Sequence, residues 1–269
     1  MTQIVVFSKD RACQLDLCLR TIEEKFHVEK NIIVQFAASN NLFMEGYQKL
    51  IGCHPGVKFV KETSFQETFL NSLRPLFQGR YILFLVDDDI FINSVDETEI
   101  RALIEMYENN PLIHSISLRM NPDVNFCYPA RKHIQRPHEF LIENNIMRWN
   151  WTQACPHYCW GYPHPIDSHI YELTRVDFIF TQEKYNNPNE FECAFLANTN
   201  RNLPYMISPV QSKIFSIQNN FVKAGAKEKS LVSPEELNSL FLSGKKISTK
   251  NLYGYSAKQV HGRIPYEYE

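Results

Sequence analysis

Three consecutive aspartates, Asp87, Asp88 and Asp89, are the cluster in this sequence best suited to chemistry. They directly follow Tyr81–Val86, a run that is apolar or aromatic throughout, as expected for a strand covered on both faces of a sheet. Carboxylates this close repel one another, and a bound divalent cation relieves the repulsion. Because alternate residues of an extended chain face the same way, we predict that Asp87 and Asp89 hold Mn²⁺ or Mg²⁺. A solvated acidic turn or a helix N-cap is the alternative.

The elements needed to position these aspartates are short apolar runs alternating with helical patterns, which indicates βαβ units around a largely parallel sheet. In such a sheet, ligands bind outside the carboxyl ends of the strands, where the aspartates are expected. We predict strands at Ile4–Phe7, Ile32–Phe36, Val57–Val60, Tyr81–Val86 and Ile113–Leu118, and helices over about Ala12–Phe26, from Ser64 to Gly79, and after the capping pair Asp96 and Glu99.

The second half of the chain has fewer periodic signals. Residues 120 to 172 are rich in Pro, His, Trp and Tyr, and irregular stretches of this length commonly form binding loops. We predict strands at Arg175–Phe180 and Lys213–Ile217, and a helix that begins after Ser233 and ends at Gly244. The tail beyond that glycine has a loop-like composition.

Composition excludes several classes of protein. The 269 residues carry a net charge of -2, which argues against non-specific nucleic-acid binding. No stretch approaches the roughly 20 apolar residues of a membrane span, and the N-terminus lacks signal-peptide features. The seven scattered cysteines are typical of a reduced, cytoplasmic protein. Four loop residues have types that suit zinc but lack a second clean ligand pair, so we expect ordinary loop residues there and keep a zinc site as the alternative: Cys155, His157, Cys159 and His164.

The phrase Tyr81-Ile-Leu-Phe-Leu-Val-Asp-Asp-Asp and the opening Ile4-Val-Val-Phe-Ser-Lys-Asp-Arg11 resemble the inverting, family-2-like glycosyltransferases of the GT-A type. The resemblance covers most of the chain and is clearest through about residue 120. It implies one α/β domain over residues 1–269, with a mixed, mostly parallel sheet and helices on both faces. Residues 1–120 would form the half that binds the nucleotide-sugar, and residues 121–269 the acceptor half and tail.

The same resemblance implies a reaction and its partners. A sugar would pass from a nucleoside-diphosphate donor, UDP-sugar foremost, to a saccharide or glycolipid acceptor, in surface polysaccharide or glycoconjugate synthesis. A divalent metal would assist, as Mn²⁺ or Mg²⁺. The implied location is the cytoplasm, with loose peripheral attachment to the inner face of a membrane as an option.

In this family the first strand–helix turn holds the base and ribose, which implies donor contacts for Ser8, Asp10 and Arg11. The end of the second strand often carries an acidic residue that reads uracil. This sequence has Ala37-Ala38-Ser39-Asn40 there, so the identity of the base stays open. Four further residues complete the implied donor site: Ser39, Asn71, Asp87 and Asp88.

The resemblance also assigns the metal and the reacting groups. His261, in Gln259-Val-His261, matches a late histidine that completes the metal site with Asp87 and Asp89. Glu192, with Glu190 as second choice, would be the base that takes the proton from the acceptor hydroxyl. First-turn carboxylates also stabilise helices without catalysis, so that alternative stays open.

Trp160 and Asp167 would line the acceptor side, by stacking on a sugar and by holding a hydroxyl. The alternative for the tryptophan is an anchor in the core.

Two other functions fit parts of the pattern. A nucleotidyltransferase on a similar sheet would need a glycine-rich first turn, and this chain has Ser8-Lys-Asp-Arg11 there. A non-catalytic carbohydrate-binding protein would use the acidic triad only structurally. A metal-dependent response to a nucleoside diphosphate would separate an enzyme from such a binding protein.

Overall fold

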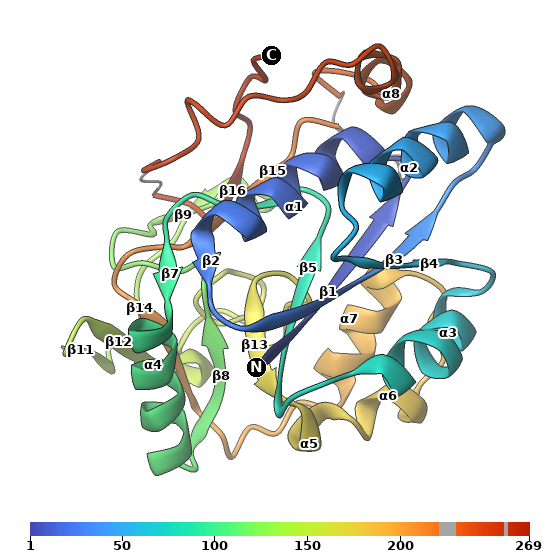
Figure 1. The fold of residues 1–269 in the computed structure, drawn as a ribbon. Coiled ribbons are helices and arrows are strands. Elements are labelled where there is room, and N and C mark those ends of the chain that lie inside the picture. The colour runs from blue at the N-terminus through green and yellow to red at the C-terminus, as the bar shows by residue number, and fades with distance from the viewer. Residues whose placement is uncertain (221–229, 256–257) are drawn as a thin grey trace.

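A nine-stranded mixed sheet forms the centre of the molecule, with helices on both faces, as predicted (Figure 1). The computed structural model describes residues 1–220, 230–255 and 258–269. The strand order is β11-β12-β14-β8-β13-β5-β1-β3-β4. Both predicted halves of the chain contribute strands, so one sheet runs through them.

Most strands of this sheet are parallel. The register pairs β5, β1, β3 and β4 in parallel, and β14 with β8, whereas β13 is antiparallel to both β5 and β8. The strands are β1 Thr2–Lys9, β3 Lys30–Ala37, β4 Lys58–Lys61, β5 Tyr81–Val86, β8 Ile113–Ser117, β11 Phe140–Glu143, β12 Ile146–Asn150, β13 His169–Glu172 and β14 Tyr205–Pro209. The shorter strands outside it are β2 Phe26–His27, β6 Asp89–Phe91, β7 Val95–Asp96, β9 Phe126–Cys127, β10 Lys132–His133, β15 Ile214–Ile217 and β16 His261–Gly262.

The helices fall into two groups, each packed into its own apolar cluster. One group is α1 Ala12–Lys25, α2 Asn41–Cys53, α4 Glu97–Asn109 and α8 Pro234–Leu242. The other is α3 Phe65–Thr68 with its continuation η1 Phe69–Leu73 and η2 Arg74–Leu76, then α5 Leu173–Val176, α6 Ile179–Gln182 and α7 Pro188–Ala197. A short 3-10 turn, η3 Trp151–Gln153, follows β12. None of the helices in the described ranges is long and apolar enough to cross a membrane.

Two segments differ from the prediction. The helix α2 was not expected, although Asn40 caps it by accepting a hydrogen bond from the Phe43 backbone amide at 3.0 Å. The predicted strand at Arg175–Phe180 is wrong, because the chain forms the helical turns α5 and α6 there. Its buried residues Val176, Ile179 and Phe180 recur at a helical spacing rather than in alternation.

An aromatic cluster fixes α7 under the central strands. Phe191 of α7 contacts Phe7 of β1 and Phe84 of β5 edge to face, with ring centroids 6.0 and 5.7 Å apart. All three rings are at most 2% exposed. Rigid packing of this kind sets the position of the next residue along the helix, Glu192.

Truncating the central strand tests this architecture. Leu83 in β5 is fully buried, so Leu83→Ala should lower the free energy of unfolding by about 2–5 kcal/mol through lost burial and a residual cavity. Leu112 is 47% exposed, and Leu112→Ala should change the free energy of unfolding by less than about 0.5 kcal/mol. Urea unfolding measures both variants, and equal losses would contradict the assignment of Leu83 to the core.

Candidate active site

The ends of three neighbouring strands bring charged residues together. Strand β13 runs antiparallel between β5 and β8, and its first residue, His169, pairs with Phe84 and with Ser117. Residues that precede β13 therefore lie beside those that follow β5 and β8. We call the group gathered there the acidic centre: Asp88, Arg119, Asp167, Glu192 and His261.

Asp87 binds the first turn of the chain rather than pointing into the acidic centre. It is 4% exposed, and its carboxylate accepts hydrogen bonds from Ser8 Oγ at 2.8 Å and from the Lys9 backbone amide at 3.4 Å. Its other oxygen forms an ion pair with Arg11 Nη1 at 2.8 Å. Arg11 also donates to the Asn220 carbonyl at 2.7 Å. Both oxygens of Asp87 are thus used to hold the Ser8–Arg11 turn against the end of β5.

Asp89 also faces inward. Its carboxylate accepts from the Val86 backbone amide at 3.1 Å and from Ser216 Oγ at 2.5 Å, and the residue is 1% exposed. Burial raises its pKa, and the charges of Asp167 and Asp88 raise it further. Ser216 lies on β15, which pairs with β6, the strand that begins at Asp89.

The predicted metal set of Asp87, Asp89 and His261 is therefore not assembled. Within residues 1–220, 230–255 and 258–269, no group of three or more His, Cys, Asp or Glu residues is placed to hold a metal ion. The sequence argument assumed alternating side chains on an extended chain. Residues 87 and 88 instead form a turn, so the alternation does not continue through the triad.

Asp88 is the half-buried member of the triad, whereas Asp87 and Asp89 are 4% and 1% exposed. Its nearest cation is Arg11, with Nη1 at 3.4 Å from Oδ2. Burial raises the pKa of Asp88 to about 6, with Asp87 and Asp167 adding to the shift and Arg11 and His261 opposing it. A raised carboxylate pKa marks a place where a further positive charge would be stabilised.

Asp167 sits between two cationic or potentially cationic groups. Its Oδ2 lies 2.5 Å from Arg119 Nη1 and 3.2 Å from His261 Nε2. Burial alone would raise its pKa, but Arg119 and His261 hold that pKa well below its usual range. Its other oxygen, Oδ1, is buried and has no hydrogen-bond partner among the described residues.

The donor types at the acidic centre fit a divalent metal. The unpartnered oxygen of Asp167 and the raised pKa of Asp88 both indicate negative charge without a matching donor. Carboxylate oxygens with an imidazole suit Mn²⁺, and carboxylates alone suit Mg²⁺. Asp88 and the unpartnered oxygen of Asp167 are the oxygen donors nearest to what such an ion would need, and His261 contacts Asp167, but the three residues are not placed as a ready metal-binding group within the described residues.

The structure separates the two candidate bases. Glu190 is exposed and forms the cap of α7, where Asn187 accepts from its backbone amide at 3.0 Å and donates to its carboxylate at 2.8 Å. Glu192 is half-buried and faces Asp167 and Tyr162. Burial raises the pKa of Glu192 to about 8, and the charge of Asp167 adds to that shift while Arg119 opposes it.

Three of the remaining donor residues lie at the ends of β1 and β3. Asp10, with a left-handed φ of 57°, accepts a hydrogen bond from the Ser39 backbone amide at 2.7 Å, and Ser8 lies beside Asp87. Asn71 is exposed on η1, and no described interaction joins it to any of these residues. The structure thus groups Ser8, Asp10 and Ser39 with the end of β5 and leaves Asn71 outside the group.

The stacking role predicted for Trp160 is wrong, because its ring is in the core. The residue is 1% exposed, and its indole N–H donates to the Val124 carbonyl at 3.0 Å. Its own carbonyl accepts from Trp149 Nε1 at 2.9 Å. A ring enclosed in this way has no free face for a sugar.

The four loop residues considered for zinc do not form a cluster within the described ranges. Cys155 is exposed, whereas Cys159 is buried. The Nε2 of His164 faces the Nε2 of His114 at 2.9 Å instead of the cysteines.

Sequence reasoning missed Arg119 as a member of the site. Arg119 follows directly on the predicted strand Ile113–Leu118, and charged residues at the carboxyl ends of parallel strands are the signal that could have identified it. Tyr162 lies in the aromatic-rich stretch that was expected to form binding loops, and tertiary packing brings it to Glu192.

Comparisons with known proteins bear on the fold. No family model matches the sequence. Over 214 residues the chain is 28% identical to the bifunctional glycosyltransferase pgtA of Dictyostelium discoideum, a match that covers 71% of this chain and 27% of that protein. The chain thus spans about a quarter of the length of this relative.

Two crystal structures of residues 1–349 of S. aureus TarS share the fold. The complex with UDP-GlcNAc has a TM-score of 0.52 and 12% identity over 84% of this chain and 61% of that one. The complex with UDP has a TM-score of 0.52 and 13% identity over 80% and 60%. This chain has the nucleotide-sugar glycosyltransferase fold. In this glycosyltransferase fold, the acidic centre lies at the carboxyl ends of β5 and β8.

The raised pKa of Glu192 predicts a pH-dependent stability. Because its folded-state pKa of about 8 exceeds its ordinary value of 4.5, ionising Glu192 destabilises the fold progressively as pH rises between these values. Glu192→Gln removes this loss, so the variant should gain stability relative to the wild type from pH 5 to pH 8, by more than about 1 kcal/mol. Urea unfolding of metal-free protein at both pH values measures the difference.

Glu190→Gln is the matched control, because the pKa of exposed Glu190 is lowered by its hydrogen bonds to Asn186 and Asn187. Its carboxylate is ionised across the whole range, so its contribution to stability should not change between pH 5 and pH 8. A Glu192→Gln variant that behaved like this control would contradict the buried environment of Glu192.

Proposed function

We propose that this protein is a metal-dependent, inverting glycosyltransferase that moves a sugar from a UDP-sugar to a saccharide-type acceptor. The observation that carries the proposal is the meeting of Asp88, Asp167 and Glu192 at the carboxyl end of the sheet, in a nucleotide-sugar glycosyltransferase fold. Similarity to a glycosyltransferase relative supports the reaction type. We assign the reaction to the synthesis of surface polysaccharide or glycoconjugate.

The donor would bind on the β1 and β3 side of the acidic centre. TarS structures in complex with UDP and with UDP-GlcNAc support a UDP-sugar as donor. We assign the base and ribose to the Ser8–Arg11 turn, which Asp87 and the Asp10–Ser39 hydrogen bond hold in place. The diphosphate would then lie next to Asp88, the triad member that is not enclosed by internal donors.

Asp88 would hold the Mn²⁺ or Mg²⁺ ion, with Asp167 and His261 beside it. When bound, the ion neutralises the charge that develops on the departing nucleoside diphosphate. Arg119 holds Asp167 through their ion pair at 2.5 Å and thereby fixes the position of this carboxylate. Arg11 shields Asp88 from Asp87, since its guanidinium lies within 3.4 Å of both.

Glu192 would act as the base. In its ionised form it takes the proton from the acceptor hydroxyl while the hydroxyl oxygen attacks the anomeric carbon and the bond to the diphosphate breaks. Attack opposite the leaving group inverts the anomeric configuration. The hydrogen bond from Tyr162 and the packing of α7 would orient the carboxylate.

Asp88→Asn tests the donor site. Wild-type protein should melt at a higher temperature with Mn²⁺ and UDP together than with either alone, because a ligand at about 100 times its Kd adds about 2.7 kcal/mol of stability. The variant should lose this joint effect, whereas Asp177→Asn, on the distant Arg74 ion pair, should keep it. Thermal melting without ligand, with Mn²⁺, with UDP and with both measures the effect. A full joint response in Asp88→Asn would contradict the assignment of Asp88 to the donor site.

Glu192→Gln tests the base. Turnover should fall by about 10²–10⁴-fold while the Kd for UDP is unchanged, because the amide cannot accept the proton. In the wild type, kcat/KM should rise with pH up to about 8, where Glu192 becomes ionised. Steady-state kinetics and calorimetric UDP binding measure these quantities. Glu190→Gln should keep wild-type turnover, and a larger loss in that variant would reverse the choice of base.

A further inference from the structure

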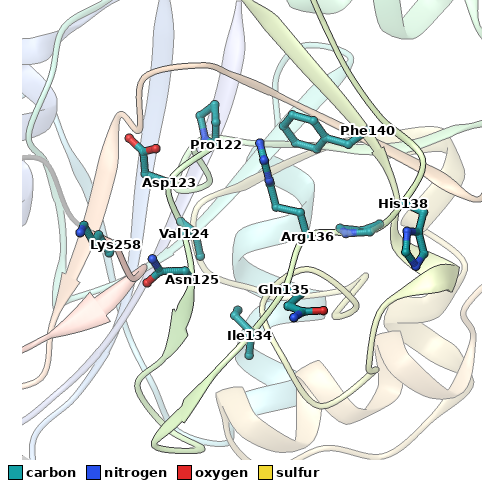
Figure 2. A pocket seen from close by; sticks show the side chains of 11 residues that line it. Pro122, Asp123, Val124, Asn125, Ile134, Gln135, Arg136, His138, Phe140 and Lys258 are labelled. Atoms are coloured by element: carbon teal, nitrogen blue, oxygen red, sulfur yellow. The ribbon is translucent and has the colours of Figure 1, made fainter.

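A cavity of about 720 Å³ opens between the segment that follows β8 and the segment that precedes β16 (Figure 2). It is lined by residues 122–125 and 134–138, with Phe140 and Lys258. This volume is within the usual range of small-molecule sites. The buried Trp160 lies behind its wall, with its ring edge to face against Phe140 at 5.8 Å.

Two chain segments connect the cavity to the acidic centre. Pro122 lies three residues beyond Arg119, and Lys258 lies three residues before His261. Because a residue spans at most about 3.6 Å of chain, Pro122 is within about 11 Å of Arg119, and Lys258 is within about 11 Å of His261. The backbone amides of Asn125 and Phe126 donate to the Lys258 carbonyl at 2.9 and 3.1 Å, which ties the two segments together.

Along the strand order of the sheet, the cavity and the assigned donor site are next to different strands. Residues 122–125 follow β8, whereas the Ser8–Arg11 turn follows β1, and β13 and β5 lie between these two strands in the sheet. A ligand in the cavity would therefore approach the acidic centre from the β8 end of the sheet, whereas the nucleotide would approach it from the β1 end. An inverting displacement needs the acceptor and the donor to approach the reacting centre from different directions.

The lining carries more positive than negative charge. It contains two cationic side chains, Arg136 and Lys258, and one carboxylate, Asp123. Figure 2 shows Lys258 and Asp123 on one side of the cavity, and Arg136 with Phe140 on the other. The guanidinium of Arg136 lies 4.8 Å from the centre of the Phe140 ring. Neither cation forms an ion pair with any described residue, so both are available to a ligand.

We propose that this cavity is the acceptor site and that the acceptor saccharide carries a phosphate or carboxylate group, bound by Arg136 and Lys258. This inference rests on the proposed function and deepens it. A guanidinium supplies paired N–H donors that match the oxygens of either anion, and the stacked Phe140 holds it in one orientation. A neutral acceptor would leave both cations unmatched.

Direct binding tests the inference without requiring turnover. Ligand-observed NMR titrations with glucose 6-phosphate, methyl glucuronide and methyl glucoside give a Kd for each probe. We expect at least one charged sugar to bind about tenfold or more tightly than methyl glucoside, because charge-assisted hydrogen bonds are stronger than neutral ones. A preference between the two charged probes identifies the anion as phosphate or carboxylate.

Substitutions localise the effect. Arg136→Gln and Lys258→Gln should each weaken binding of the preferred charged sugar about tenfold. Arg148→Gln is the matched control for the first, because Arg148 stacks on Tyr205 at 4.9 Å but does not line the cavity. Lys132→Gln, an exposed lysine of β10, is the control for the second. Both controls should retain wild-type affinity.

Several results would overturn the inference. These are equal Kd values for charged and neutral sugars, no measurable binding of either charged sugar, or an equal loss in the control variants. Inorganic phosphate that binds as tightly as glucose 6-phosphate would also overturn it, because no sugar would then be recognised. UDP binding is measured separately. Its absence would refute the proposed function, even if the charged sugar still bound in the cavity.

Discussion

Pairing of buried charge at the carboxyl end of the sheet is the constraint on which the rest of the site depends. Two arginines, Arg11 and Arg119, are each at most 11% exposed in their side chains and each lies against a carboxylate, Asp87 and Asp167. Removing one partner of such a pair would leave a buried charge uncompensated. The two ion pairs therefore fix the first turn of the chain and the start of β13 relative to β5.

These pairings divide the aspartate triad into separate roles. Asp87 is occupied by the Ser8–Arg11 turn, and Asp89 by Val86 and Ser216. Asp88 remains half-buried, with one long ion-pair contact, to Arg11, among the described residues, and its raised pKa reflects a negative charge that is only partly compensated. Two of the three carboxylates thus stabilise the framework, and the third is left for a ligand.

The same logic separates the glutamates of α7. The cap uses Glu190 because its carboxylate can reach the backbone amide of Asn186 and the side chain of Asn187. Glu192, two residues later, points to a different side of the helix and faces Asp167. Arg119 compensates the negative charge of Asp167, and no such cation is paired with Glu192 among the described residues. A carboxyl group in that position stays protonated to a higher pH than an exposed one, which suits a group that exchanges a proton with an acceptor.

The sequence by itself determined the central strands, the strand-end position of the aspartates and the caps at Asp96 and Ser233, because these depend on local periodicity and local hydrogen bonds. It did not determine which carboxylates face a ligand, that Trp160 is buried, or that Arg119 joins the site. The roles of the carboxylates and of Arg119 depend on β13 returning antiparallel between β5 and β8 and on the turn at residues 87 and 88, and the burial of Trp160 depends on its contacts with Val124 and Trp149. Only the tertiary structure could decide them, since each arises from contacts between residues far apart in the chain.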